Sequence, residues 1–125
     1  MAVNYRTSLK TTRLTAVRDD IDSGASAGYI EICSSAYALV LATITLTDPC
    51  GSVTTDVLTF TMPHSDVSAD NTGTAAIARI KESTGTTIVS GLSVGTSGTD
   101  IILTSLGITA GDTVTLNSAT ITHAA

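Results

Sequence analysis

Positively charged side chains are scarce in this sequence. The 125 residues include 6 Lys and Arg against 11 Asp and Glu, which gives a net charge of −5. Proteins that bind nucleic acid draw most of their affinity from Lys and Arg contacts with phosphates. The balance therefore argues against a direct nucleic-acid partner. Charged residues make up 14% of the chain and hydrophobic residues 42%, which is too apolar a composition for a disordered protein.

Aromatic residues are also few. The chain has three Tyr, one Phe and no Trp. Surfaces that bind sugars or single-stranded nucleic acid usually need aromatic platforms. Tyr29 and Tyr37 are the only candidates for such a platform in the strand region of the chain.

Long apolar runs and cysteine frameworks are missing as well. No run approaches the ~20 residues of a membrane-spanning helix, so we expect no membrane partner. Met1 is followed by no apolar export segment, and we expect synthesis in the cytoplasm. Cys33 and Cys50 are too few for a disulfide scaffold and lack metal-site spacing. Two free thiols are the default expectation, and a bridge between neighbouring strands is the alternative.

The sequence shows no recognisable catalytic, metal or cofactor motif. His64 and His123 are the only histidines, and neither belongs to a nucleophile–base pattern that spacing can identify. His64, Asp66, Asp70 and Asn71 form the densest polar cluster, but the alternating acids and closing Glu of a calcium loop are absent. We therefore predict no enzyme activity, no catalytic residues, no metal site and no cofactor. Glu31, between two Ile residues, is expected to face solvent or an interface.

What the sequence has in abundance is threonine, with 24 residues. Thr is β-branched and suits a pleated sheet, while its hydroxyl keeps the outer face polar. Short alternating segments follow one another from Gly28 onward. The expected strands are 29–32, 39–46, 57–62, 75–81, 86–90, 101–104, 112–116 and 119–122. The segment 75–81 could alternatively be helical.

Turn residues separate these strands. Turns are expected at 48–51, at the hairpin connection 82–85 and at 110–112, with polar loops at 64–74 and 91–99. Pro63 should end the strand before it, because it has no N–H for the ladder. About eight antiparallel strands without interleaved helices predict an all-β sandwich or barrel.

One helix is expected, over residues 5–22. Leu14, Val17 and Ile21 make a narrow apolar stripe, and Thr7 or Ser8 can cap the start. We expect a single domain over 1–125, with an N-terminal helical arm at 1–24 and a β-sandwich at 28–123. Basic residues near the start and acidic residues near the end oppose the helix dipole. The helix should therefore need packing or a partner.

Four of the six basic residues lie in this segment: Arg6, Lys10, Arg13 and Arg18. The rest of the chain is strongly acidic. Such asymmetry suggests that the segment meets a different partner from the rest. We predict that these four residues form a contact arm for an acidic neighbour.

Segments rich in Thr, Ala and Gly follow the opening segment Tyr5–Asp22: they are Ile77–Gly95, Thr99–Leu103 and Ile108–His123. Together these segments resemble small virion proteins of tailed bacteriophages. Within that group the chain is most similar to the cement, or decoration, proteins on the outside of the capsid. The resemblance implies a β-sandwich of jelly-roll type, binding to the major capsid protein, and a homo-dimer or homo-trimer at capsid symmetry positions. It implies localisation on the virion and no catalytic residues.

The functional expectation is a structural virion protein that stabilises the shell by bridging major capsid protein subunits. The alternative is a phage tail or bacterial surface β-domain that binds glycan or a protein. A glycan module would show a groove with exposed Tyr or Asp side chains.

Overall fold

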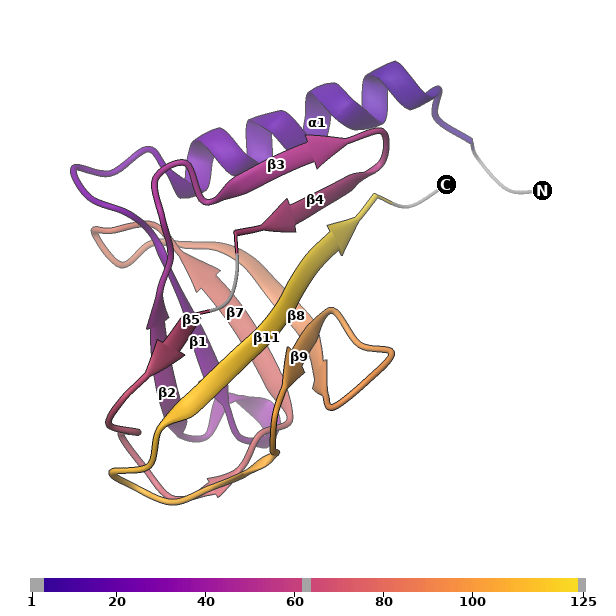
Figure 1. Cartoon of the computed structure of the whole chain (residues 1–125). Coiled ribbons are helices and arrows are strands. Elements are labelled where there is room, and N and C mark those ends of the chain that lie inside the picture. The colour runs from indigo at the N-terminus through magenta and orange to yellow at the C-terminus, as the bar shows by residue number, and fades with distance from the viewer. Residues whose placement is uncertain (1–3, 62–63, 124–125) are drawn as a thin grey trace.

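A computed structural model describes residues 4–61 and 64–123 (Figure 1). It contains one α-helix, α1 (Thr7–Ile21), and one short 3-10 helix, η1 (Ser35–Tyr37). The strands are β1 (Tyr29–Cys33), β2 (Val40–Thr45), β3 (Gly51–Thr54), β4 (Val57–Phe60), β5 (His64–Asp66), β6 (Gly73–Thr74), β7 (Ile77–Lys81), β8 (Thr87–Gly95), β9 (Ile101–Leu103), β10 (Gly107–Ile108) and β11 (Val114–Thr122).

Nine strands form one curled sheet with the order β2-β1-β7-β8-β9-β11-β4-β3, and β5 pairs with β11 outside this path. β10 and β6 make a separate two-stranded sheet. The main sheet folds over so that β5 approaches β2, the strand at its far end. The expected all-β, sandwich-like fold with one N-terminal helix is therefore confirmed.

The sheet is mixed rather than wholly antiparallel. β8 and β9 run parallel, with Val94 opposite Ile101 and Gly95 opposite Ile102. The connection turns back on itself because Ser93 and Asp100 exchange two hydrogen bonds across it, and because Gly98 adopts a φ of +69°. Side-chain bonds of this kind leave no signal in the hydrophobic pattern.

Glycines that suggested loops lie inside or at the ends of strands. β8 continues through Gly91 to Gly95 instead of ending at residue 90. The register with β7 shifts between Ala78 and Ile80, and Gly91, with a φ of +75°, lies in the extra length of β8. A bulge of this type adds a residue without ending the strand. The expected loop 91–99 is therefore wrong over its first half.

The strand expected at 75–81 is confirmed as β7, which alternates buried Ala78 and Ile80 with partly exposed residues, and the helical alternative for this segment is wrong. Two other expectations need correction. The expected strands 112–116 and 119–122 are one strand, β11, with a register shift after Leu116. β3 was not expected, because Gly51 was assigned to a turn. Gly51 lies so close to the backbone of Thr59 that a Cβ would be 2.2 Å from its carbonyl oxygen.

The polar segment 64–74 contains the short strands β5 and β6. The connection at 82–85 is confirmed, with Gly85 at a φ of +100°. Glu82 supports it by accepting hydrogen bonds from the Thr84 hydroxyl and the Thr86 N–H. The expected strand end at Pro63 lies outside the described residues.

The core lies between the layers of the curled sheet and beneath α1. Leu14 and Ile21 of α1 belong to the same buried cluster as the sheet residues, and Val17 packs against it. Cys33 and Cys50 are buried free thiols. Among the described residues, no helix combines the length and the apolar character needed to cross a membrane.

Candidate functional site

The helix α1 lies along the β3–β4 hairpin (Figure 1). Its expected apolar stripe, Leu14, Val17 and Ile21, faces the core. A helix with so narrow a stripe gains most of its stability from packing. The hairpin therefore supports α1 along its length, with a smaller contact from β8.

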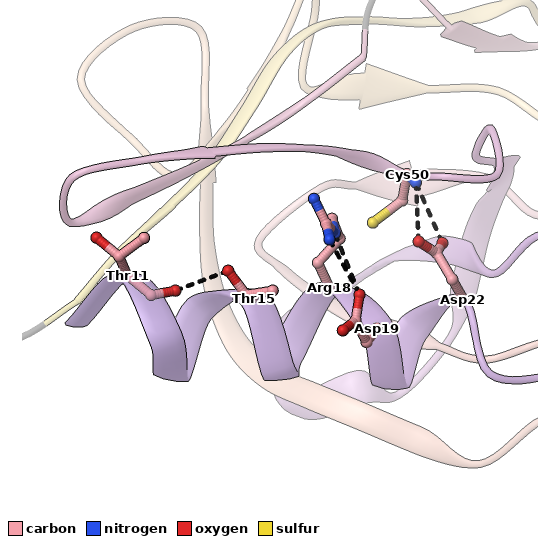
Figure 2. A network of polar contacts seen from close by, with 6 residues as sticks. All are labelled: Thr11, Thr15, Arg18, Asp19, Asp22 and Cys50. Atoms are coloured by element: carbon pink, nitrogen blue, oxygen red, sulfur yellow. Dashed lines mark hydrogen bonds and ion pairs between the residues drawn. The ribbon is translucent and has the colours of Figure 1, made fainter. Parts of the chain in front are cut away.

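Polar bonds attach both ends of α1 to the hairpin. Near the start, the Thr11 hydroxyl donates to the carbonyl of Thr55. At the end, both carboxylate oxygens of Asp22 accept the Cys50 N–H, at 3.1 and 3.3 Å (Figure 2). Burial raises the pKa of Asp22, and the hydrogen bond from the Cys50 N–H opposes this effect. These bonds fix the position of the helix on the sheet.

The N-terminus of α1 is electrostatically unfavourable within this chain. The N-cap is Arg6, not Thr7 or Ser8, and no side chain caps the helix. The first turn contains no acidic residue. Cations near a helix N-terminus oppose the dipole, at a cost of about 0.3–1 kcal/mol each. The charges at this end of α1 therefore lower the stability of the helix.

Three of the four predicted basic residues lie on one side of the helix. Arg6, Lys10 and Arg13 are four and three residues apart, which places them along one face. Arg6 and Arg13 are exposed and Lys10 is partly exposed. Leu9, on the same side, is 40% exposed. We call Arg6, Leu9, Lys10 and Arg13 the basic ridge.

The cations of the basic ridge form no ion pair with any residue in 4–61 or 64–123. Arg13 stacks over the ring of Tyr5, with 5.1 Å from the guanidinium carbon to the ring centroid. Tyr5 is 38% exposed and meets the ring of His123 edge-on, with 5.5 Å between centroids. The two ends of the described chain therefore meet beside the ridge.

Arg18 does not belong to this group. It follows Arg13 by five residues, which turns it well away from the ridge. Its Nη2 lies 3.2 Å from Oδ1 of Asp19 (Figure 2). The predicted four-residue arm is thus three residues on one face and a fourth that pairs locally.

The polar cluster around His64 covers a sheet edge. Asp66 accepts the Thr43 N–H at 3.0 Å, and Asn71 donates to the Val40 carbonyl at 2.7 Å. Asp70 accepts from the Thr43 hydroxyl. These side chains substitute for a neighbouring strand along β2. The Nε2 atom of His64 is buried without a hydrogen-bond partner.

A small cavity of about 130 Å³ lies between the β9–β10 connection and the start of β11. Small-molecule sites usually measure roughly 300–1,000 Å³. Half of its lining residues bear a hydroxyl group and none is aromatic: Thr104, Ser105, Gly107, Ile108, Asp112, Thr113, Val114 and Thr115. The part of the chain described here groups no three His, Cys, Asp or Glu side chains as metal ligands.

Sequence reasoning missed a charged cluster on the outer face of β1 and β7. Glu31 accepts from Arg79 and Lys81, and Arg79 stacks over Tyr37. From the sequence, only the two-residue spacing of Arg79 and Lys81 indicates that their side chains lie on one face of a strand. Their pairing with Glu31 depends on the register of β1 against β7, in which Glu31 lies opposite Arg79.

The fold and these surfaces define the chain as an all-β, sandwich-like protein with one N-terminal helix. Its strongest candidate site is the exposed basic ridge. Comparisons with protein-family models, curated proteins and solved structures found no match.

Proposed function

We propose that this chain is a structural binding protein that attaches through its basic ridge to an acidic surface of a multi-subunit shell. In its specific form, the proposal is a cement protein on the outside of a bacteriophage capsid that bridges major capsid protein subunits. The observation that carries the proposal is the row of cations along the first half of α1, which have no acidic partner within residues 4–61 and 64–123.

Local rules are usually broken where function requires it. Arg6 and Lys10, at the N-terminal end of α1, cost helix stability through the dipole. None of Arg6, Lys10 and Arg13 gains an ion pair in the described chain. An acidic partner would supply the missing interaction and steer the encounter. The exposed Leu9 and Tyr5 add the apolar contact area that protein interfaces use.

Shell stabilisation follows from mass action. A protein that binds the assembled lattice more tightly than dispersed subunits raises the stability of the lattice. One copy offers one basic ridge, so a homo-dimer or homo-trimer would present several ridges at fixed spacing. Linked contacts of modest strength then gain affinity through avidity.

The test is binding of the purified chain to empty capsids of the virus that encodes it, measured by co-sedimentation over a range of NaCl concentrations. The double variant Arg6→Gln with Arg13→Gln should bind roughly tenfold more weakly or worse, and its binding should depend less on salt. The matched control is Ser8→Glu with Thr12→Glu. It changes the net charge by the same amount on another exposed side of α1.

Equal binding of the double variant and the unaltered chain would contradict the assignment of the ridge. Absence of capsid binding together with retention on a polysaccharide column would favour the glycan-binding alternative.

A further inference from the structure

The outer face of β1 and β7 holds two cations around one carboxylate. Oε1 of Glu31 accepts a hydrogen bond from Arg79 Nε at 2.6 Å and lies 3.1 Å from Lys81 Nζ. Both cations share the same oxygen. The cluster therefore carries an excess positive charge in a chain that is acidic overall.

Arg79 is held from a second side by Tyr37. The guanidinium carbon lies 5.0 Å from the centroid of the Tyr37 ring. The Tyr37 hydroxyl accepts the N–H of Gly91 in β8 at 2.7 Å. The ring is therefore fixed between β8 and Arg79, and the plane of the guanidinium is fixed by Glu31 and by the ring.

The turn that presents Tyr37 is strained. Ala36 and Tyr37 both have positive φ, at 57° and 58°. For residues other than glycine this conformation costs on the order of 1–3 kcal/mol each. Ser34 closes the turn by exchanging hydrogen bonds with Leu39 through both its backbone N–H and its hydroxyl. η1 contributes no buried residue to the core, so core packing does not explain the strain.

The arrangement leaves the terminal nitrogens of Arg79 unused. Neither donates a hydrogen bond to any residue within the described ranges, and the side chain is 25% exposed. A guanidinium offers a planar fork that matches a carboxylate with two parallel hydrogen bonds. Leu39, two residues beyond Tyr37, is 46% exposed and adds an apolar neighbour at the same turn.

We propose that Arg79 anchors a second protein-binding site, which takes a carboxylate side chain from an acidic segment of a partner protein. Glu31 and Tyr37 are positioning residues that hold the guanidinium in one plane. Lys81 adds charge beside it. A fixed Arg loses less conformational entropy on binding than a free one. The preformed support therefore favours a specific carboxylate contact over loose ion pairing.

This site is separate from the basic ridge and does not depend on capsid attachment. β1 begins beside the end of α1, where Gly28 packs against Ile21, and leads away from the helix. The turn with Tyr37 follows the far end of β1. One copy therefore has two positively charged contact points, on different parts of its surface.

The test is a nuclear magnetic resonance titration of the full chain with a capped hexaglutamate peptide at constant ionic strength. The Arg79 Nε–H and Gly91 N–H signals report on this site alone, whereas signals of α1 report on the basic ridge. Both reporter signals should shift saturably with peptide. In Arg79→Lys the Gly91 shift should need about tenfold more peptide or more, because the charge remains but the fork is lost.

Arg18→Lys makes the same chemical change in an ion pair elsewhere and should leave the Gly91 response unaltered. Tyr37→Leu should weaken peptide binding while the Arg79 charge stays. Equal shifts with NaCl alone, or equal affinity of Arg79→Lys, would overturn the proposal. Reporter shifts that follow protein concentration without peptide would assign this face to a second copy of the chain and also overturn it.

Discussion

Asp22 joins the end of α1 to the start of β3 through a single backbone N–H. Asp22→Ala leaves the Cys50 N–H without its acceptor and should cost about 1–3 kcal/mol of unfolding free energy. Asp22→Asn keeps an acceptor oxygen and removes a charge that burial disfavours, as the raised pKa of Asp22 indicates. Asp22→Asn should therefore lower the unfolding free energy clearly less than Asp22→Ala does. Urea unfolding at pH 7 measures both variants, and equal losses would show that the hydrogen bond does not matter.

The two thiols should be inert in the folded protein. Burial raises the pKa of Cys33, and burial together with the Asp22 charge raises the pKa of Cys50 to about 12. The thiolate is the reactive form, so very little is present at pH 8. A thiol-reactive disulfide reagent should label neither residue in buffer and both in concentrated urea. Rapid labelling of the folded chain would contradict the described packing.

Glu31 should contribute an acid-sensitive part of the stability. Burial alone would raise its pKa, but the hydrogen bonds from Arg79 and Lys81 hold the pKa below its ordinary value of 4.5. Its stabilising contribution is therefore present above that value and is lost as pH falls through the lower pKa of the folded state. Glu31→Gln should be less stable than the unaltered chain at pH 7 and nearly equal to it at pH 2. Urea unfolding at both pH values tests this, and a constant difference would contradict it.

The helix α1 is an integral part of the core as well as a candidate contact surface. Leu14 is 2% exposed and Leu9 is 40% exposed on the same helix. Leu14→Ala should cost about 2–5 kcal/mol of unfolding free energy, and Leu9→Ala within about 0.5 kcal/mol of zero. Thermal or urea unfolding of these two variants measures the difference. Similar losses would mean that the stripe does not anchor the helix.

Removal of residues 1–22 should accordingly destabilise the whole chain. An arm that only contacts a partner would leave the β-sandwich folded when it is removed. The structure places Leu14 and Ile21 inside the shared core, so truncation would expose the sheet beneath them.

The helix and most strands were predictable because their signals are local. Periodic apolar residues indicated α1, and alternation indicated β1, β2, β4 and β7. Bulges at Gly91 and after Leu116, and the parallel pairing of β9, were not predictable, because they depend on register and on bonds such as Ser93–Asp100. For the same reason, one candidate site was predictable from the sequence and the other was not. Helical spacing aligns Arg6, Lys10 and Arg13, whereas the Arg79 cluster requires β1, β7 and the Tyr37 turn to meet.

Other parts of the chain lie along both end strands of the main sheet. Asp66, Asp70 and Asn71 occupy the outer edge of β2, and α1 lies along β3 at the other end of the sheet. Covered edges discourage the addition of a foreign strand. The outward cations, on α1 and around Arg79, are then the features that set this surface apart in a chain of net charge −5.

The most direct measurement of the proposed capsid attachment is the number of chains bound per empty capsid of the phage that the proposal requires, together with the melting temperature of that capsid. The proposal predicts saturation at a fixed copy number and a higher melting temperature of the occupied capsid. Binding that never saturates, or an unchanged melting temperature at full occupancy, would contradict it.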